Sequence, residues 1–216
     1  MYAKFWKRFF DFTLSLLALI VLSPILLILT VVGAIAMRGN PFFTQARPGK
    51  IDKNTGKEKI FKLIKFRTMS NKRDKDGNLL PDAERLNGYG KFLRKTSLDE
   101  LGELVNIVKG DMAIVGPRPL LVAYLPRYSA RQRRRHEVRP GLTGYAQAYG
   151  RNLLTWKEKF EKDVYYVDNL SFWLDVKIIF KTISVVLKRE GITSDTSVTM
   201  EEFMGVEKEM KVINHE

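Results

Sequence analysis

The chain has 216 residues, no cysteine and a formal net charge of +13, from 37 Lys and Arg against 24 Asp and Glu. The lack of cysteine excludes disulfides and thiolate metal sites, and it fits a reducing cytoplasmic setting. The positive charge indicates an anionic partner, for which nucleic acid, anionic lipid headgroups and phosphorylated substrates all qualify.

A long uncharged segment lies near the start of the chain. Phe12 to Met37 is 26 residues without a charge, and as one helix it would reach about 39 Å, against a hydrocarbon core of about 30 Å. A cleaved signal peptide fits poorly, because the run is too long and no small-residue cleavage site precedes Arg38. The segment therefore predicts a membrane anchor, for which an ordinary spanning helix is the simplest form.

Two features favour a bent anchor. Pro24 has no N–H, so the helix kinks and the carbonyl of Ile20 loses its partner, a loss that Ser23 can repair in part by bonding back to a carbonyl. Basic residues flank both sides, namely Lys4, Lys7 and Arg8 before the segment and Arg38, Arg47, Lys50 and Lys53 after it. The positive-inside rule is then best satisfied when both ends stay cytoplasmic. We predict a re-entrant helix broken at Ser23-Pro24.

Two short strands are predicted next, at 42–45 and 59–67, with the turn of a hairpin at 52–56. Residues 71–90 are polar and contain three glycines and a proline. That composition predicts a mobile surface loop.

A helix is predicted from Leu98 to about Val108, with Ser97 as its N-cap and Gly110 as its stop. Asp99-Glu100 lies in its first turn. Acidic residues are common there simply because they suit the helix dipole.

Helical patterns return at 120–137, 155–168 and 172–187. The last is amphipathic, which fits either packing against the core or lying in a membrane interface. Within the first, four arginines at 131 and 133–135 could contact nucleic acid, but a solvated or lipid-facing basic helix is favoured beside an anchor. His136 follows them and is predicted to be a surface residue.

Cationic side chains on stiff loops and at a strand end shift the reading of Asp99-Glu100 toward chemistry. Arg118 lies in the rigid turn Gly116-Pro117-Arg118-Pro119, and Arg139 begins Arg139-Pro140-Gly141-Leu142-Thr143-Gly144. The second strand ends at Lys65-Phe66-Arg67. A carboxylate pair among such cations predicts phosphoryl chemistry, with a carboxylate available as metal ligand or nucleophile.

Many motifs in order carry a resemblance to a known family. They include residues 7–11, 23–24, 43–49, 65–69, 96–101, 109–112, 115–119, 139–144, 150–152 and 163–167. These segments resemble the bacterial sugar transferases, or small monotopic phosphoglycosyl transferases, over nearly the whole chain. The chain is most similar to the subgroup that starts N-linked glycan assembly on a lipid carrier, the undecaprenyl phosphate N,N'-diacetylbacillosamine 1-phosphate transferase type.

The resemblance implies a reaction in which a UDP-sugar and polyprenyl (undecaprenyl) phosphate give polyprenyl-diphosphate-sugar and UMP. This would be the first membrane step of glycoconjugate biosynthesis. In the family the aspartate of the Asp-Glu pair attacks the β-phosphate with Mg²⁺ present, forming a covalent phosphosugar intermediate. The resemblance thus implies Asp99 as nucleophile and Mg²⁺ ligand, and Glu100 as acid/base or orienting neighbour.

The resemblance also implies which residues contact the substrates or their phosphates: Lys65, Arg67, Arg118, Arg139, Thr143, Arg151, Asp163 and Asp175. Arg118 resembles the phosphate-holding arginine of the family. Asp163 and Asp175 match recurring acids of unassigned role, for which buried salt bridges are an equal alternative.

The expected fold class is α+β. We expect a re-entrant anchor over 1–38, a small and mostly helical catalytic domain over 39–200 with a short β-hairpin and interfacial amphipathic helices, and a tail over 201–216. The expected location is the cytoplasmic face of the bacterial inner membrane, with its anionic lipids and not nucleic acid as partners. The sequence does not determine the UDP-sugar, the pathway or the oligomeric state.

Two other functions stay open. A non-catalytic membrane tether with a basic binding module predicts no divalent-metal dependence and binding that falls steeply with salt. A membrane-bound phosphodiesterase would use water in place of the lipid phosphate, and it would work at full rate without the lipid.

Overall fold

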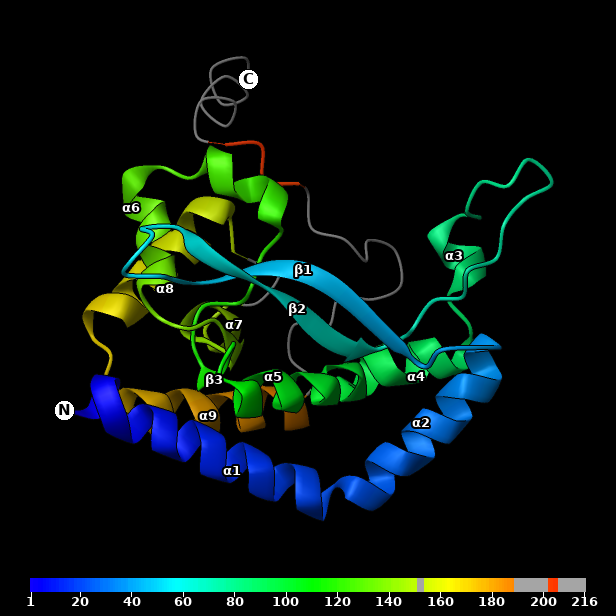
Figure 1. Cartoon of the computed structure of the whole chain (residues 1–216), viewed down its shortest axis with the longest axis horizontal. Coiled ribbons are helices and arrows are strands. Elements are labelled where there is room, and N and C mark those ends of the chain that lie inside the picture. The colour runs from blue at the N-terminus through cyan, green and yellow to red at the C-terminus, as the bar shows by residue number, and fades with distance from the viewer. Residues whose placement is uncertain (151–153, 189–201, 206–216) are drawn as a thin grey trace.

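The computed structural model describes residues 1–150, 154–188 and 202–205, which combine helices with two small sheets (Figure 1). The helices are α1 (Lys7–Val21), α2 (Ser23–Met37), α3 (Asp82–Arg85), α4 (Gly88–Thr96), α5 (Glu103–Lys109), α6 (Ala130–Arg133), α7 (Tyr145–Ala148), α8 (Trp156–Asp168) and α9 (Phe172–Leu187). The strands are β1 (Phe42–Ile51), β2 (Glu58–Phe66), β3 (Ala113–Val115) and β4 (Gly141–Thr143). One π-helical turn, η1 (Tyr2–Trp6), and three 3₁₀ segments, η2 (Leu98–Gly102), η3 (Val122–Arg127) and η4 (Arg134–Glu137), complete the set.

The first two helices meet at a bend of 65° (Figure 1). Among the described residues no single helix is long and apolar enough to cross a bilayer, whereas η1 and α1 joined with α2 meet that requirement as a bent pair. The hydroxyl of Ser23 donates to the carbonyl of Ile20 at 2.7 Å, which is the repair expected beside the missing N–H of Pro24. The helix therefore breaks at Ser23-Pro24, as predicted.

Both arms of the bent pair are attached to the rest of the molecule. On α1, Arg8 donates to the carbonyls of Ile107 and Val108 in the last turn of α5 at 2.6 and 2.8 Å, where the helix dipole favours a cation. Asp11 accepts the backbone N–H of Ile114 at 2.9 Å. On α2, the carbonyl of Leu29 accepts from the hydroxyl of Tyr89 at 2.8 Å. The inner faces of α1 and α2 thus form part of the fold.

The hairpin pairs β1 with β2 in antiparallel register from Phe42↔Phe66 to Pro48↔Ile60. Both strands were predicted, but β1 is longer than the expected 42–45 because pairing continues to Ile51. The register shifts between Pro48 and Ile51, which fits a proline that cannot donate to the ladder and is tolerated at edges and bulges.

The helix predicted from Leu98 to Val108 is divided into η2 and α5. Ser97 does not cap it: this residue ends α4 in the left-handed region, with φ of 56°, and its side chain makes no capping bond. A Cβ on Gly102 would lie 2.8 Å from the carbonyl of Ile64, so the turn packs directly on β2. Gly110, with φ of 90°, ends α5 as predicted.

Other expected elements differ in continuity. The helical pattern at 120–137 forms three short segments, η3, α6 and η4, and Pro126 lies within the first. The loop expected at 71–90 contains α3 and the start of α4. By contrast, α8 and α9 follow the predicted ranges, and Thr155 and Glu158 form a capping box at the start of α8.

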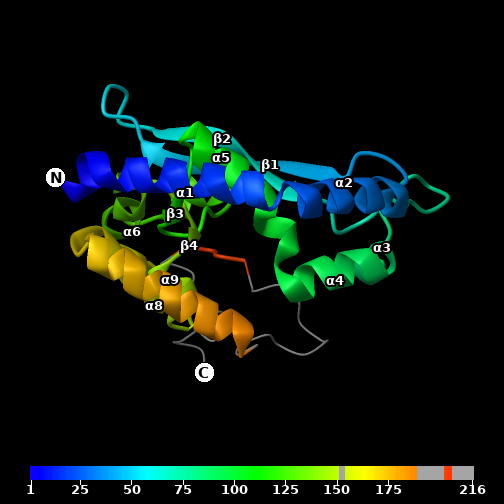
Figure 2. The same ribbon diagram turned by 90° about the horizontal axis from the view of Figure 1, so that it is seen from below.

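Helix α9 packs inward on one face and is exposed on the other. Ile178 is fully buried beside Val115 and Tyr166, so this face packs against the core. On the opposite face Trp173 is 75% exposed and Phe180 68% exposed. Seen from below, α1, α2, α4 and α9 lie along the underside of the molecule (Figure 2).

Candidate active site

A group of charged side chains surrounds Glu100 where η2 packs against β2. Lys65 lies 2.9 Å from Glu100 and 2.9 Å from Glu103, so one ammonium joins two carboxylates. The guanidinium of Arg118 contacts the same Glu100 oxygen at 2.7 Å. The Arg118 side chain stays 44% exposed, which leaves some of its guanidinium N–H groups open to a ligand.

Glu100 is held ionised by these two cations. Burial on its own raises the pKa of the Glu100 carboxyl, but the charges of Arg118 and Lys65 outweigh burial and lower the pKa to about 2. A carboxylate fixed in this way can orient a neighbour or accept a hydrogen bond.

Asp99 is the carboxylate of the group that lacks an ion pair. Within the described residues no cation lies in salt-bridge range of it, and burial, followed by the charge of Glu100, raises the pKa of the Asp99 carboxyl. Its oxygens are therefore the ones available to a ligand.

Two other arginines hold the Arg118 loop by donating to its backbone carbonyls. Arg135 donates to the Arg118 carbonyl at 2.7 Å and pairs with Asp163 at 2.8 Å in a buried salt bridge. Arg47 donates to the carbonyl of Pro119 at 3.3 Å. Asp163, expected at the substrate, thus has the structural role left open as its alternative.

Glu103 and Arg47 were not assigned to the site from sequence. Glu103 lies three residues after Glu100, a spacing that places side chains on one helical face, and this spacing was the signal. Arg47 faces the site from β1 with its Nε buried and unpartnered. Burial and then the charge of Arg118 lower the pKa of its guanidinium. Its only sequence signal was its place in the 43–49 motif.

The two stiff loops meet through their glycines at the parallel β3–β4 pair, which was not predicted. The Gly116 N–H donates to the Thr143 carbonyl at 2.9 Å and the Gly141 N–H to the Pro117 carbonyl at 3.0 Å. A Cβ on Gly141 would lie 2.1 Å from the Gly116 nitrogen, so only glycine permits this approach.

Several residues expected at the site have other partners. Arg139 donates to the Gly110 carbonyl at 3.0 Å, and its charged neighbours are Arg8 and Asp11, not Asp99. The Thr143 hydroxyl bonds that of Thr182 at 2.7 Å and so ties β4 to α9.

Asp175 lies in a buried network that joins α9 to η1, α1 and α8. It contacts Lys7 at 2.8 Å and accepts from the hydroxyls of Tyr2 and Tyr166 at 2.5 and 2.7 Å. The salt-bridge alternative therefore holds for Asp175 as well.

Arg67 continues from the end of β2 and is half-buried, with its backbone N–H bonded to the Pro41 carbonyl at 2.7 Å. Arg151 lies outside the described residues.

The arginine run is neutralised by acids of its own fold. Arg131 pairs with Glu161, Arg133 with Glu58, and Arg134 with Glu137 and Asp168. The prediction that His136 lies at the surface is wrong: it is 3% exposed, and its Nδ1 lies 3.2 Å from the Gly49 carbonyl. Its ring packs against that of Tyr128, with the ring centroids 5.6 Å apart.

The donor set suits a magnesium ion held partly by substrate. In the described part of the chain no three carboxylate or imidazole groups converge as a ready-made metal site, but Mg²⁺ is commonly held by one or two carboxylates together with substrate phosphates. The unpaired Asp99 would supply one such oxygen ligand, and an added cation would relieve its repulsion with Glu100.

Known proteins match this sequence along most of its length. Residues 2–189 fit the model of a family described as bacterial sugar transferase. The Uncharacterized sugar transferase EpsL of Bacillus subtilis is 50% identical over 92% of this chain and 96% of its own length. The Undecaprenyl-phosphate galactose phosphotransferase of Salmonella typhimurium is 36% identical over 88% of this chain and 42% of its own. The UDP-glucose:undecaprenyl-phosphate glucose-1-phosphate transferase of Klebsiella pneumoniae is 39% identical over 82% and 39%. The chain thus spans nearly all of the Bacillus relative and less than half of the other two.

Proposed function

Because the chain belongs to the bacterial sugar transferase family, we propose that it moves a sugar-1-phosphate from a UDP-sugar to undecaprenyl phosphate and releases UMP. The names of the Salmonella and Klebsiella relatives support the lipid acceptor, and the Klebsiella name supports the UDP-sugar donor. The observation that carries the proposal is the pair of adjacent acids Asp99 and Glu100. Lys65 and Arg118 hold Glu100 ionised, whereas the carboxylate of Asp99 is unpaired.

The chemistry runs in two displacements. An Asp99 oxygen attacks the β-phosphorus of the UDP-sugar, the bond from that phosphorus to the bridging oxygen breaks, and UMP leaves with the bridging oxygen. A phosphate oxygen of the lipid then attacks the same phosphorus, and the Asp99 carboxylate is released. Dividing one transfer between two bulky substrates into two displacements is the advantage of a covalent route.

The neighbours have separate tasks. The exposed part of the Arg118 fork grips a phosphate in bidentate fashion, while Lys65 fixes Glu100 so that it orients Asp99 or handles the proton. Arg67, and Arg151 as the family resemblance implies, would contact the nucleotide phosphates. When bound, Mg²⁺ would be held by Asp99 and would neutralise charge on the diphosphate.

The bent pair supports a monotopic position on the cytoplasmic face of the bacterial inner membrane, with residues 1–38 as a re-entrant anchor and 39–200 as the catalytic domain. Both arms bond to the same domain, as required if both ends stay on one side. The exposed apolar face of α9 would lie in the interface beside it.

The test is a search for the covalent intermediate with UDP-sugars labelled in the sugar phosphate. With Mg²⁺ and without lipid, the wild-type chain should retain one label on Asp99 and release one UMP, and added undecaprenyl phosphate should discharge the label. Asp99→Asn should lose both adduct and turnover, since an amide is a poor nucleophile and a poor Mg²⁺ ligand.

Each competing reaction gives a different outcome. Sustained UMP release without lipid would indicate a phosphodiesterase, and no UMP from any of a panel of UDP-sugars would indicate a non-catalytic tether. Turnover that requires both substrates bound together, with no adduct, would leave Asp99 as a metal ligand only and overturn the two-step route.

A further inference from the structure

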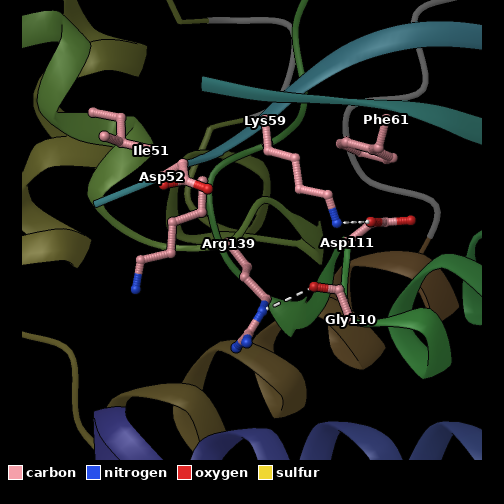
Figure 3. Close-up of a pocket in the computed structure, with 9 residues that line it drawn as sticks. Ile51, Asp52, Lys59, Phe61, Gly110, Asp111 and Arg139 are labelled. Atoms are coloured by element: carbon pink, nitrogen blue, oxygen red, sulfur yellow. Dashed lines mark hydrogen bonds and ion pairs between the residues drawn. The ribbon is translucent and has the colours of Figure 1, made fainter. Parts of the chain in front are cut away.

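A pocket lies at the turn end of the hairpin, between the strands and the residues that follow α5 (Figure 3). Its volume is about 230 Å³, and Lys50, Lys59, Asp52, Asp111 and Arg139 contribute its charged lining. Pockets for drug-sized ligands hold about 300–1,000 Å³. This one therefore suits a small polar group.

The acids of the pocket already have partners. Asp111 pairs with Lys59 at 3.1 Å (Figure 3). An oxygen of Asp52 accepts the backbone N–H groups of Asn54 and Thr55 at 2.7 and 3.3 Å and so holds the hairpin turn. Asp111 thus has a cation partner, whereas Asp52 is bonded to neutral N–H groups and forms no ion pair among the described residues.

Two cations of the pocket form no salt bridge among the described residues. Arg139 donates to the neutral carbonyl of Gly110, with Asp11 as a neighbouring acid beyond salt-bridge range, and Lys50 forms no ion pair. Burial and then the charge of Arg139 lower the pKa of Lys50, and burial and then the charge of Arg8 lower the pKa of Arg139. The three cations and two acids of the lining thus leave one net positive charge, which an anion would neutralise.

We propose that this pocket binds a phosphate group between Lys50 and Arg139. The pairing of a guanidinium fork with an ammonium suits several oxygens on one phosphorus. Both the phosphate of a lipid headgroup and soluble phosphate carry this chemistry. The lipid source is within reach because Arg8 of α1 borders Gly110, and the same helix exposes aromatic side chains such as Phe9.

The pocket is separate from the Asp99 group. The charges nearest Asp99 are Glu100, Lys65 and Arg118, and none of these lines the pocket. The proposal therefore does not depend on the transfer reaction, and its test uses binding and not turnover.

The experiment is calorimetric titration of the full-length chain in neutral detergent, with inorganic phosphate and with short-chain phosphatidate at matched ionic strength. Lys50→Gln removes one pocket cation from a surface position and should weaken pocket binding about tenfold or more. Lys57→Gln is the matched control, since it removes the same charge from the same hairpin turn but outside the pocket. It should bind as the wild type does.

Arg118→Gln separates the two sites, because phosphate bound at Arg118 is lost in that variant while pocket binding remains. Tighter binding of phosphatidate than of inorganic phosphate would identify the lipid headgroup as the source, and equal binding would identify soluble phosphate. Equal affinities in wild type and Lys50→Gln, or equal losses in Lys50→Gln and Lys57→Gln, would overturn the proposal, as would the absence of binding.

Discussion

Lys65 connects two carboxylates that lie on neighbouring turns, and Arg118 adds a second cation to one of them. This arrangement concentrates positive charge on Glu100 and leaves Asp99 without a counter-ion. The difference between two adjacent acids therefore comes from their partners and not from their residue types.

Arg118 is expected to bind phosphate through two parallel N–H groups of its guanidinium. Arg118→Lys keeps the charge but loses the two parallel N–H donors, so turnover should fall about 10- to 100-fold. Arg131→Lys is the control, because that guanidinium pairs with Glu161 at an exposed position and its replacement should leave turnover unchanged. Steady-state rates of UMP release measure both, and near-normal turnover of Arg118→Lys would make Arg118 a structural residue.

His136 should make the fold sensitive to acid. Burial and then the charge of Arg135 lower the pKa of the His136 imidazole to about 3, against about 6.5 in an unfolded chain. Between these values the unfolded state binds a proton that the native state excludes, so stability is full above about pH 6.5 and falls as the pH decreases toward 3. The slope approaches about 1.4 kcal/mol per pH unit.

Unfolding midpoints measured from about pH 7 to about pH 5 test this window, which lies above the range of ordinary carboxyl groups. His136→Gln should flatten the decline, whereas His215→Gln, which replaces the other histidine of the chain, should retain it. An unchanged decline in His136→Gln would assign the acid sensitivity to other groups.

At the scale of elements, the bend between α1 and α2 depends on one missing helical hydrogen bond, and the directions of the two helices depend on several tertiary bonds. Pro24 removes a helical hydrogen-bond donor, and the Ser23 hydroxyl donates to the Ile20 carbonyl in its place. The direction of each arm is then fixed by bonds to the domain, such as Arg8 to α5 and Tyr89 to α2.

Sidedness of the anchor is the corresponding prediction. Single cysteines at Ala3 and Lys53, both exposed, should react together with an impermeant thiol reagent in inside-out vesicles and should both be protected in intact cells. The chain has no native cysteine to interfere. Labelling of the two positions from opposite sides would establish a spanning helix and refute the re-entrant anchor.

At the scale of the whole molecule, apolar residues remain exposed along α1, α2 and α9, which share the underside of the fold (Figure 2). The basic residues of the arginine run are paired with acids elsewhere in the fold. This distribution favours a lipid surface over nucleic acid as the large partner.

Trp173 should report this contact directly. In a variant that keeps only this tryptophan, through Trp6→Phe and Trp156→Phe, brominated lipids should quench its fluorescence because the side chain is 75% exposed on α9. The matched variant that keeps only Trp156 should be quenched far less, since that ring packs with Tyr124, Phe160 and Phe203. Equal quenching of the two would place α9 away from the membrane.

Much of the fold and part of the site followed from sequence because their causes are local. The break at Pro24, the hairpin, the range of α8 and the two-faced α9 depend on residues a few positions apart, and short-range sterics and periodicity act at that distance. The association of Asp99 and Glu100 with Lys65 and Arg118 came from motifs, and the structure brings these four residues together.

Only the tertiary structure decided which of the other charged residues are partners. Arg118 and Arg139 sit on similar stiff loops, yet one contacts Glu100 and the other lines a separate pocket. His136 is buried and Asp163 is paired because η4 and α8 pack together. The parallel contact of β3 with β4 joins segments far apart in the chain. Such pairings depend on how distant segments pack, so the sequence around one residue does not indicate its distant partner.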